Sequence, residues 1–233
     1  MDSDFRVSAR QLPTIALLAG VPAGDLAEFA ATAHSRRLQA GERVFHQGDT
    51  EVRVHAVLEG SVRISQAGHD GAEVVMRFIG PGQVFGAVAL FTDGYYPADA
   101  TALVETVETS WSEAEFFRLM AVHPCVAINA IRMIGRRLQE AQHRIREIAT
   151  QSAERCIGHA LLRLARSSGR KTAEGIAILF PLRRQDVADI AGTTHFTVSR
   201  VLAGWEKAGL VVSRQQTITL RRIEALRKIA EAV

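Results

Sequence analysis

The residues from Arg183 to Leu202 carry the pattern in this chain that is best suited to binding a nucleic acid. Two apolar-faced helical stretches flank Ala191-Gly192-Thr193; the glycine permits a tight turn, and Thr193 or Thr194 can cap the second stretch. The outer face of that second stretch consists of Thr194, His195, Phe196, Thr197, Ser199 and Arg200. Such a helix fits the major groove of duplex DNA. We therefore predict a helix-turn-helix, because a hairpin used only for packing would not need an arginine and several hydroxyls outside.

The charge distribution points to the same partner. Residues 150–233 carry a net charge of +7 and the rest of the chain −4, although the whole chain carries only +3. A basic C-terminal part beside an acidic N-terminal part favours contact with a polyanion such as double-stranded DNA. A solvated basic surface without a partner is the alternative.

A long helix is predicted after Pro124. Its apolar positions follow one another at intervals of three and four residues: Ile131, Ile134, Leu138, Ala141, Ile145 and Ile148. This heptad seam is what two parallel helices bury against each other, so it predicts a homodimer. The alternative is that the stripe packs on the chain's own β domain.

The region from Arg36 to Trp111 reads as short strands with β-branched alternation. Glycines punctuate it at regular intervals, as in a compact antiparallel barrel or sandwich: Gly41, Gly48, Gly60, Gly71, Gly82 and Gly94. Short helices are expected at 23–33 and 113–121, the second capped by Ser112. Beyond the long helix we expect a helix from Glu154 that ends in a polar turn at 167–170, a strand at 176–179, and a final hairpin at 211–213 and 217–220. The predicted domains are residues 1–122, 123–152 and 153–233.

The composition excludes several classes of protein. No run of about 18 apolar residues occurs, and the N-terminus lacks the basic start and apolar stretch of a secretion signal, so we expect a cytoplasmic protein without a membrane partner. The only cysteines, Cys125 and Cys156, are far apart and indicate neither a disulfide framework nor a cysteine-built metal site. No nucleophile elbow, phosphate-binding glycine loop or H-E-x-x-H pair is present, so no enzyme is predicted.

The chain resembles the CRP/FNR family of transcription regulators over its entire length. The resemblance rests on Gln47-Gly48-Asp49, 58–62, 80–86 and Leu90-Phe91 in the β region, and on 197–202 and 205–211 near the C-terminus. It implies an α+β fold with an N-terminal antiparallel β-roll of the jelly-roll kind as sensor, a long dimerisation helix and a C-terminal winged helix-turn-helix. It also implies RNA polymerase as a partner and a role as an activator, although no residue pattern separates activation from repression.

The resemblance assigns roles to residues in both helical stretches of the predicted helix-turn-helix. The arginine at the position of Arg200 reads guanine, whose O6 and N7 acceptors match a guanidinium fork. Thr194 and Thr197, with Arg184 and Gln185 on the first helix, match positions that touch phosphates. Phe196 departs from the glutamate common in the family, so we expect it either to contact a thymine methyl group or to pack inward.

The effector pocket implied by the resemblance has lost its ionic groups. The cyclic-nucleotide members use a glutamate and an arginine-serine or arginine-threonine pair, where this chain has Ala87 and Pro97-Ala98. We therefore predict that cyclic AMP does not bind, and the absence of an N-terminal cysteine group removes the iron-sulfur option. The expected pocket comprises Val84, Gly86, Ala87, Val88, Leu90, Pro97, Ala98 and Asp99, with Ala141 and Gln142 from the long helix.

The remaining resemblance, centred on 96–102, is to the nitrogen-oxide-responsive branch, some of whose members hold haem. Axial ligands could come from the eight histidines: His34, His46, His55, His69, His123, His143, His159 and His195. No sequence pattern singles one out, and His55 at the start of a strand is the first to test. A small-molecule-binding module with a vestigial DNA reader is the alternative function.

Overall fold

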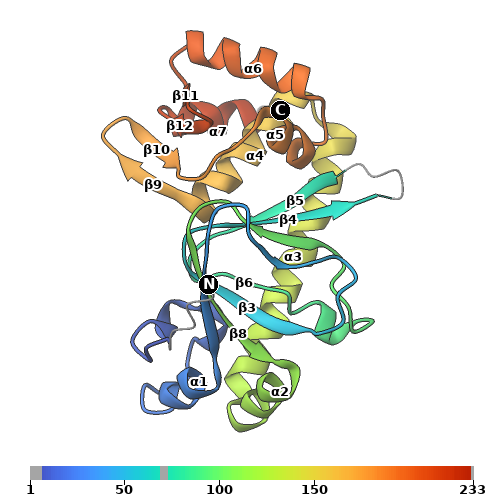
Figure 1. Ribbon diagram of the computed structural model, residues 1–233. Coiled ribbons are helices and arrows are strands. Elements are labelled where there is room, and N and C mark those ends of the chain that lie inside the picture. The colour runs from blue at the N-terminus through green and yellow to red at the C-terminus, as the bar shows by residue number, and fades with distance from the viewer. Residues whose placement is uncertain (1–6, 69–72, 232–233) are drawn as a thin grey trace. The chain divides into compact units, whose positions relative to one another are not determined.

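The computed structural model of the protein describes residues 7–68 and 73–231, which fold as two compact units (Figure 1). The first unit takes in Met1–Ala72 and Ile79–Gln139, and the second takes in Glu73–Phe78 and Glu140–Val233. The predicted order of β-roll, long helix and winged helix-turn-helix is confirmed. Gly71 and His69, which entered the sequence predictions, lie outside the described residues.

Two antiparallel sheets form the β-roll. Its strands are β1 (His34–Leu38), β2 (Arg43–Phe45), β3 (Arg53–Glu59), β4 (Val62–Ala67), β5 (Glu73–Ile79), β6 (Val84–Phe85), β7 (Asp99–Ala102) and β8 (Thr106–Ser112). One sheet has the order β1-β8-β3-β6 and the other β2-β7-β4-β5. In the first sheet Arg36 on β1 lies opposite Glu108 on β8, and His55 on β3 lies opposite Ser110.

The two faces of the first sheet bury different cores. One face packs against η1 (Leu12–Thr14), η2 (Ala16–Leu18), α1 (Leu26–Thr32) and α2 (Glu113–Val122). There the indole N–H of Trp111 donates to the carbonyl of Phe29 at 2.9 Å. The core between the sheets contains Phe45, Phe85 and Tyr96 and lies beside η3 (Ala89–Phe91). Because side chains alternate along a strand, β3 and β6 each contribute side chains to both cores.

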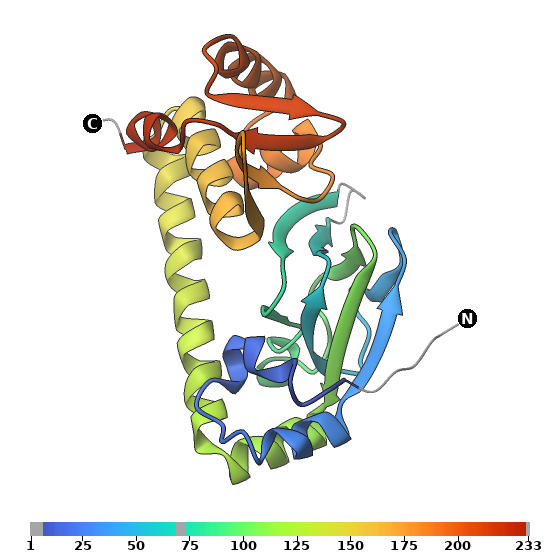
Figure 2. The same ribbon diagram turned by 90° about the vertical axis from the view of Figure 1, so that its left-hand side faces the viewer.

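The predicted long helix is α3 (Pro124–Thr150), which runs without a break (Figure 2). It follows α2, whose predicted cap is confirmed: the Ser112 hydroxyl accepts from the Glu115 N–H at 3.4 Å, and Glu115 accepts from the Ser112 N–H at 2.9 Å. In the described part of the chain no single helix is long and apolar enough to cross a membrane; α2 and α3 meet such a test only as a pair bent by 114°.

The second unit contains α4 (Ala153–Ser168), β9 (Gly169–Thr172), β10 (Gly175–Ile178), α5 (Arg184–Ala191), α6 (His195–Lys207), β11 (Val211–Arg214), β12 (Thr217–Leu220) and α7 (Ile223–Glu231). Its sheet has the order β11-β12-β10-β9. The helix predicted from Glu154 ends within 167–170 as expected, at Ser168, but the predicted turn there is wrong, because β9 begins at once and pairs with β10. The closing helix α7 was also not predicted. Cys125 and the buried Cys156 are free thiols.

The tip of the β11–β12 hairpin is strained. Arg214 pairs with Thr217, and the two residues between them, Gln215 and Gln216, have φ angles of 47° and 64°. Tight hairpins of this kind prefer Asn-Gly, because the left-handed region costs a residue with a side chain about 1–2 kcal/mol. The two glutamines are therefore held at the wing tip against their backbone preference.

Candidate DNA-binding face and effector cavity

The turn between α5 and α6 is built as the sequence predicted. Gly192 ends α5 with φ of 66°, and a Cβ there would lie 2.7 Å from the Cδ1 atom of Ile148. Thr194, rather than Thr193, caps α6: its hydroxyl accepts from the Thr197 N–H at 3.2 Å. Val198 and Leu202 are buried beneath the helix, so the register of α6 is set by its apolar side.

The opposite side of α6 faces solvent. His195, Phe196, Ser199 and Arg200 are exposed, while Thr197 is half-buried beside the cap. Phe196 is 75% exposed, and its ring lies against that of His195 with 3.8 Å between centroids and the two planes tilted by 37°. The inward packing that remained open for Phe196 is therefore wrong, and the phenyl ring belongs to the outer face.

The two predicted phosphate contacts on α5 have partners within the domain. The Arg184 guanidinium lies 3.2 Å from the hydroxyl of Ser213 and 3.5 Å from Glu206. The Gln185 amide donates to Asp189 at 2.6 Å. Arg184 thus links α5 to α6 and to the wing strand β11, which gives it a positioning role besides any contact with DNA.

The predicted dimer seam is an exposed apolar stripe on α3. Ile131, Leu138 and Ile145 are 70%, 60% and 68% exposed, and Ile134 and Ile148 are 37% and 43% exposed. Ala141 lies on the same stripe and is also exposed. Ile148 also lies close to Gly192, because a Cβ at that glycine would be 2.7 Å from its Cδ1 atom. The alternative that the whole stripe packs on the chain's own β domain does not hold.

The residues predicted to line an effector pocket differ in their burial. Val84, Ala87 and Ala98 are buried, Leu90 is partly buried, and Val88 and Pro97 are exposed. The carbonyl of Val84 accepts from the guanidinium of Arg137 on α3. Ala141 and Gln142 are exposed on the part of α3 that belongs to the second unit.

Asp99, the acidic member of that set, is already bound. Its carboxylate accepts from Arg43 at 3.0 Å and from the backbone N–H of Gln47 at 2.8 Å. These bonds tie the start of β7 to β2 and to the loop that follows it. Asp99 is therefore an anchor for the roll.

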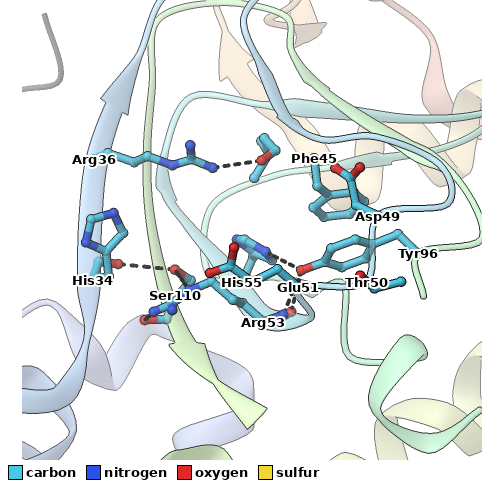
Figure 3. A pocket seen from close by; sticks show the side chains of 11 residues that line it. His34, Arg36, Phe45, Asp49, Thr50, Glu51, Arg53, His55, Tyr96 and Ser110 are labelled. Atoms are coloured by element: carbon cyan, nitrogen blue, oxygen red, sulfur yellow. Dashed lines mark hydrogen bonds between the residues drawn. The ribbon is translucent and has the colours of Figure 1, made fainter. Parts of the chain in front are cut away.

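A cavity of about 700 Å³ lies elsewhere in the roll, and none of the predicted effector residues lines it. Its walls are Arg36, Arg53, His55 and Ser110 from the first sheet and Phe45 with Tyr96 opposite, as Figure 3 shows. Asp49, Thr50 and Glu51 come from the loop before β3. The sequence contained one signal for this site: charged and polar residues at alternate positions of predicted strands, where an interior face should be apolar.

A buried polar network forms the floor of this cavity. The His55 ring lies 3.1 Å from Glu108 through Nδ1 and 2.9 Å from the Tyr96 hydroxyl through Nε2. Glu108 also accepts from Arg36 at 2.7 Å, and the Tyr96 hydroxyl accepts from the Arg53 N–H at 2.7 Å. Burial raises the pKa of Tyr96 to about 12, so its hydroxyl keeps its proton.

Glu108 is the charged centre of the network. Burial alone raises the pKa of this carboxyl, but the charge and hydrogen bond of His55, together with Arg36, outweigh burial and hold the pKa below its ordinary value. The carboxylate is thus ionised with no exposed surface. It is stable there because both neighbours hydrogen-bond it.

The contacts of the His55 ring decide whether this histidine can serve as an axial ligand of haem. Both ring nitrogens of His55 are engaged, and the ring is 2% exposed, so a metal at this histidine would have to displace Glu108 or Tyr96. Within the described residues no group of three or more His, Cys, Asp or Glu side chains is arranged to hold a metal ion. His55 does not fit the role of axial ligand.

Comparison with known proteins accounts for both units. Residues 35–123 match the family model described as the cyclic nucleotide-binding domain, and residues 157–229 match the Crp-like helix-turn-helix domain. The cyclic AMP receptor protein of Thermus thermophilus is 31% identical over 82% of this chain and 85% of its own length. The chain belongs to the CRP/FNR family of transcription regulators.

Solved structures agree with this membership. The catabolite activator protein of Thermus thermophilus matches with 28% identity and a TM-score of 0.53, over 92% of this chain and 98% of its own. FixK2 of Bradyrhizobium japonicum, at 23% identity, shares the fold with a TM-score of 0.74, over 86% of this chain and 98% of its own. Membership of the CRP/FNR family leaves the signal at the β-roll to be identified from this chain's own residues.

Replacing Glu108 by glutamine is expected to lower the free energy of unfolding by roughly 3 kcal/mol, because Arg36 loses its ionised partner. The folded-state pKa of Glu108 lies below its ordinary value of 4.5, so its stabilising effect is complete above that value and is lost as the pH falls through the folded-state pKa. Urea unfolding between about pH 3 and about pH 7 measures both effects.

The variant should therefore lose less stability on acidification than the wild type. Glu105→Gln removes an exposed carboxylate just before the same strand and is the matched control. An identical dependence of stability on pH in wild type and E108Q would contradict the role assigned to Glu108.

Proposed function

We propose that this chain is a homodimeric, sequence-specific DNA-binding transcription regulator that reads a palindromic site with α6 and responds to a small molecule at the β-roll. The observation that carries the proposal is the two-sided character of α6. Val198 and Leu202 are buried, and Ser199 and Arg200 face solvent in the N-terminal half of the helix. A helix held from one side by its own domain offers its other side to the major groove.

Each exposed group on α6 has a proposed task. Arg200 donates its fork to O6 and N7 of a guanine, and Phe196 contacts a thymine methyl group at the neighbouring step. Thr194, Thr197, Arg184 and Gln185 bind phosphates and fix the register on the duplex. The wing residues from Arg214 to Gln216 contact the backbone beside the site, which would give the strained glutamines a use.

The exposed stripe of α3 supports the proposed dimer. Two copies of this helix, packed in parallel along Ile131, Ile134, Leu138, Ala141, Ile145 and Ile148, would remove the most exposed apolar side chains of α3 from water. Two recognition helices would then read two half-sites of a palindrome. A dimer also explains why a helix this apolar on one side remains uncovered within one chain.

The setting and partners follow from this activity. We place the protein in the cytoplasm, bound to double-stranded DNA and acting on RNA polymerase, as an activator and not as an enzyme. Relatives such as the global regulator of Mycobacterium tuberculosis are described as cAMP-activated transcriptional regulators. A binding module with a vestigial reader is the competing function, and selection of DNA sequences by the purified protein separates the two.

The signal is proposed to be neither cyclic AMP nor an iron-sulfur cluster. Ala87 and Pro97-Ala98 offer no ionic partner for a ribose or a cyclic phosphate, and an unpaired buried phosphate costs several kcal/mol. Haem is the second candidate signal, but its axial ligand would be a histidine other than His55, where ligation would break a bond to Glu108 or Tyr96. A small organic effector suits the roll better.

Arg200→Ala should weaken binding to the selected site by about 1–3 kcal/mol and relax the preference for guanine at one position of each half-site. Selection from random duplexes, followed by titration at two salt concentrations, measures both effects. Lys228→Ala on exposed α7 is the control, because it removes a positive charge without touching α6. A selected motif whose guanine survived the Arg200 change would count against this reading of the helix.

Leu138→Glu should convert the dimer into a monomer and reduce affinity for the palindrome at least tenfold, because it places a charge in the seam. Sedimentation velocity and DNA titration give the two results. Gln139→Glu adds the same charge at the next exposed position of α3, off the stripe, and should leave both unchanged. Monomeric wild-type protein would refute the proposed assembly.

Calorimetry with cyclic AMP should give no binding in the submillimolar range. The control is restoration of the missing groups, with Ala87→Glu and Pro97→Arg combined with Ala98→Ser, which should raise the affinity. Submillimolar binding by the wild type would overturn the prediction.

A further inference from the structure

The cavity between the sheets is polar where a β-roll interior is ordinarily apolar. His34, Ser110 and His55 form one row across β1, β8 and β3, and Arg36 lies opposite Glu108 in the next row. Because residues two apart on a strand share a face, these rows line the same wall. A wall of this composition, beside a void of about 700 Å³, has the size and the convergent polar groups of a small-molecule site.

The cavity wall presents directed donors. Arg36 uses Nε on Glu108 and Nη2 on the carbonyl of Val44, and Arg53 uses Nε and Nη2 on Ser110. Each arginine is thus fixed in position and keeps its Nη1 group for a further acceptor. Two guanidinium groups held in this way favour a carboxylate.

The loop before β3 brings the opposite charge. Asp49 and Glu51 line the cavity on exposed positions of that loop. Asp49 is held by the N–H of His46, which donates to its carboxylate at 2.8 Å. A simple anion would meet these carboxylates on its way to the arginines, so the lining suits a ligand that carries both charges.

The remaining wall is flat and apolar. Phe45 and Tyr96 stack with their centroids 3.6 Å apart and their planes at 4°, and Figure 3 shows both beside the cavity. Stacked rings favour a planar apolar group next to them.

From this lining we propose that the cavity binds a small zwitterion with a planar apolar side chain, an aromatic amino acid in chemical class. Its carboxylate binds Arg36 and Arg53, its ammonium group binds Asp49 with Glu51, and its ring lies along Phe45 and Tyr96. This site is separate from the segment on which the family resemblance would place an effector.

The site is coupled to that segment through Gly86. A Cβ at Gly86 would lie 2.8 Å from the carbonyl oxygen of Arg53 and 2.9 Å from Cδ2 of His55. The backbone at Gly86 is therefore packed directly against the cavity floor. Two residues earlier, the Val84 carbonyl accepts from Arg137 of α3. A ligand that shifts Arg53 or His55 thereby moves the turn and its bond to the helix. An effect on DNA affinity rests on the proposed function, whereas binding itself does not.

The test is calorimetry of the full chain with three probes that share a phenyl ring and differ in the charged groups they carry. L-phenylalanine carries both groups, phenylacetate only the carboxylate, and phenethylamine only the ammonium. L-phenylalanine should bind with a dissociation constant on the order of 0.1–1 mM, as expected for a ligand of this size. Each probe that carries only one of the two charged groups should bind at least tenfold more weakly. Equal binding of phenylacetate would overturn the assignment of a zwitterion, and failure of all three probes would overturn the site.

Variants locate the binding in the cavity. Asp49→Asn keeps the acceptor for His46 and should weaken L-phenylalanine about tenfold without weakening phenylacetate, which loses a repelling charge. Arg53→Gln should weaken both. Asp93→Asn, on an exposed loop, and Arg37→Met, which points to the opposite face of β1 from Arg36, should change neither. Unaltered affinity in both D49N and R53Q would place the ligand elsewhere and refute the proposal.

DNA titration with and without L-phenylalanine tests the coupling. A change of at least threefold in affinity for the selected site is expected in wild type and not in D49N. Calorimetric binding without any change in DNA affinity would refute the coupling through Gly86. Absence of specific DNA binding in both states would instead count against the proposed function, and the calorimetric result for the cavity would stand.

Discussion

Glu108 has no exposed surface, and its two carboxylate oxygens are held by Arg36 on β1 and by His55 on β3. An ionised carboxylate in the interior is stable only when its partners are in place, so this centre ties the three adjacent strands of one sheet together. Through His55 it also fixes the Tyr96 hydroxyl, which closes the other side of the roll. Much of the geometry of the β-roll follows from satisfying one buried charge.

The same centre explains why the roll holds a cavity. Two arginines, a histidine and a tyrosine directed toward one interior cannot pack as densely as leucines and valines, because each must reach a hydrogen-bond partner. The space between them remains open and polar. Gly86 has no side chain because the cavity floor and Tyr96 occupy the volume that a Cβ would need. Only the main chain at Gly86 therefore separates the cavity from the segment on which the family resemblance places an effector.

In the second unit the corresponding constraint is the burial of the apolar side of α6. Val198, Leu202 and Trp205 face the interior of the domain. Gly192, at the end of α5, permits the sharp turn that brings α6 back against α5. Once these residues are buried, Arg200 and Phe196 have no place except the outer face. The apolar stripe on α3 differs from this, because Ile131, Leu138 and Ile145 remain largely exposed within one chain; the proposed dimer would bury them against a second helix.

The sequence by itself determined the elements whose pattern is local. The α6 cap at Thr193 or Thr194, the turn at Gly192, the heptad stripe of α3 and the cap at Ser112 depend on residues within a few positions of one another. Periodicity and capping chemistry therefore predict them, and the structure selects Thr194. The family motifs in the sequence also predicted the order of the larger parts: β-roll, long helix and winged helix-turn-helix. The strand β9 and the helix α7 were not predicted, because their boundaries depend on packing against α4 and β10.

Only the tertiary structure decided where the polar groups of the roll meet. Arg36, His55, Tyr96 and Glu108 are distant in sequence, and nothing local indicates that the antiparallel register brings Arg36 opposite Glu108 and His55 beside it. The same holds for Asp99, which the sequence placed in an effector pocket and the fold joined to Arg43 and Gln47. Long-range pairing sets these contacts, because strand register and the closure of two sheets are properties of the whole domain.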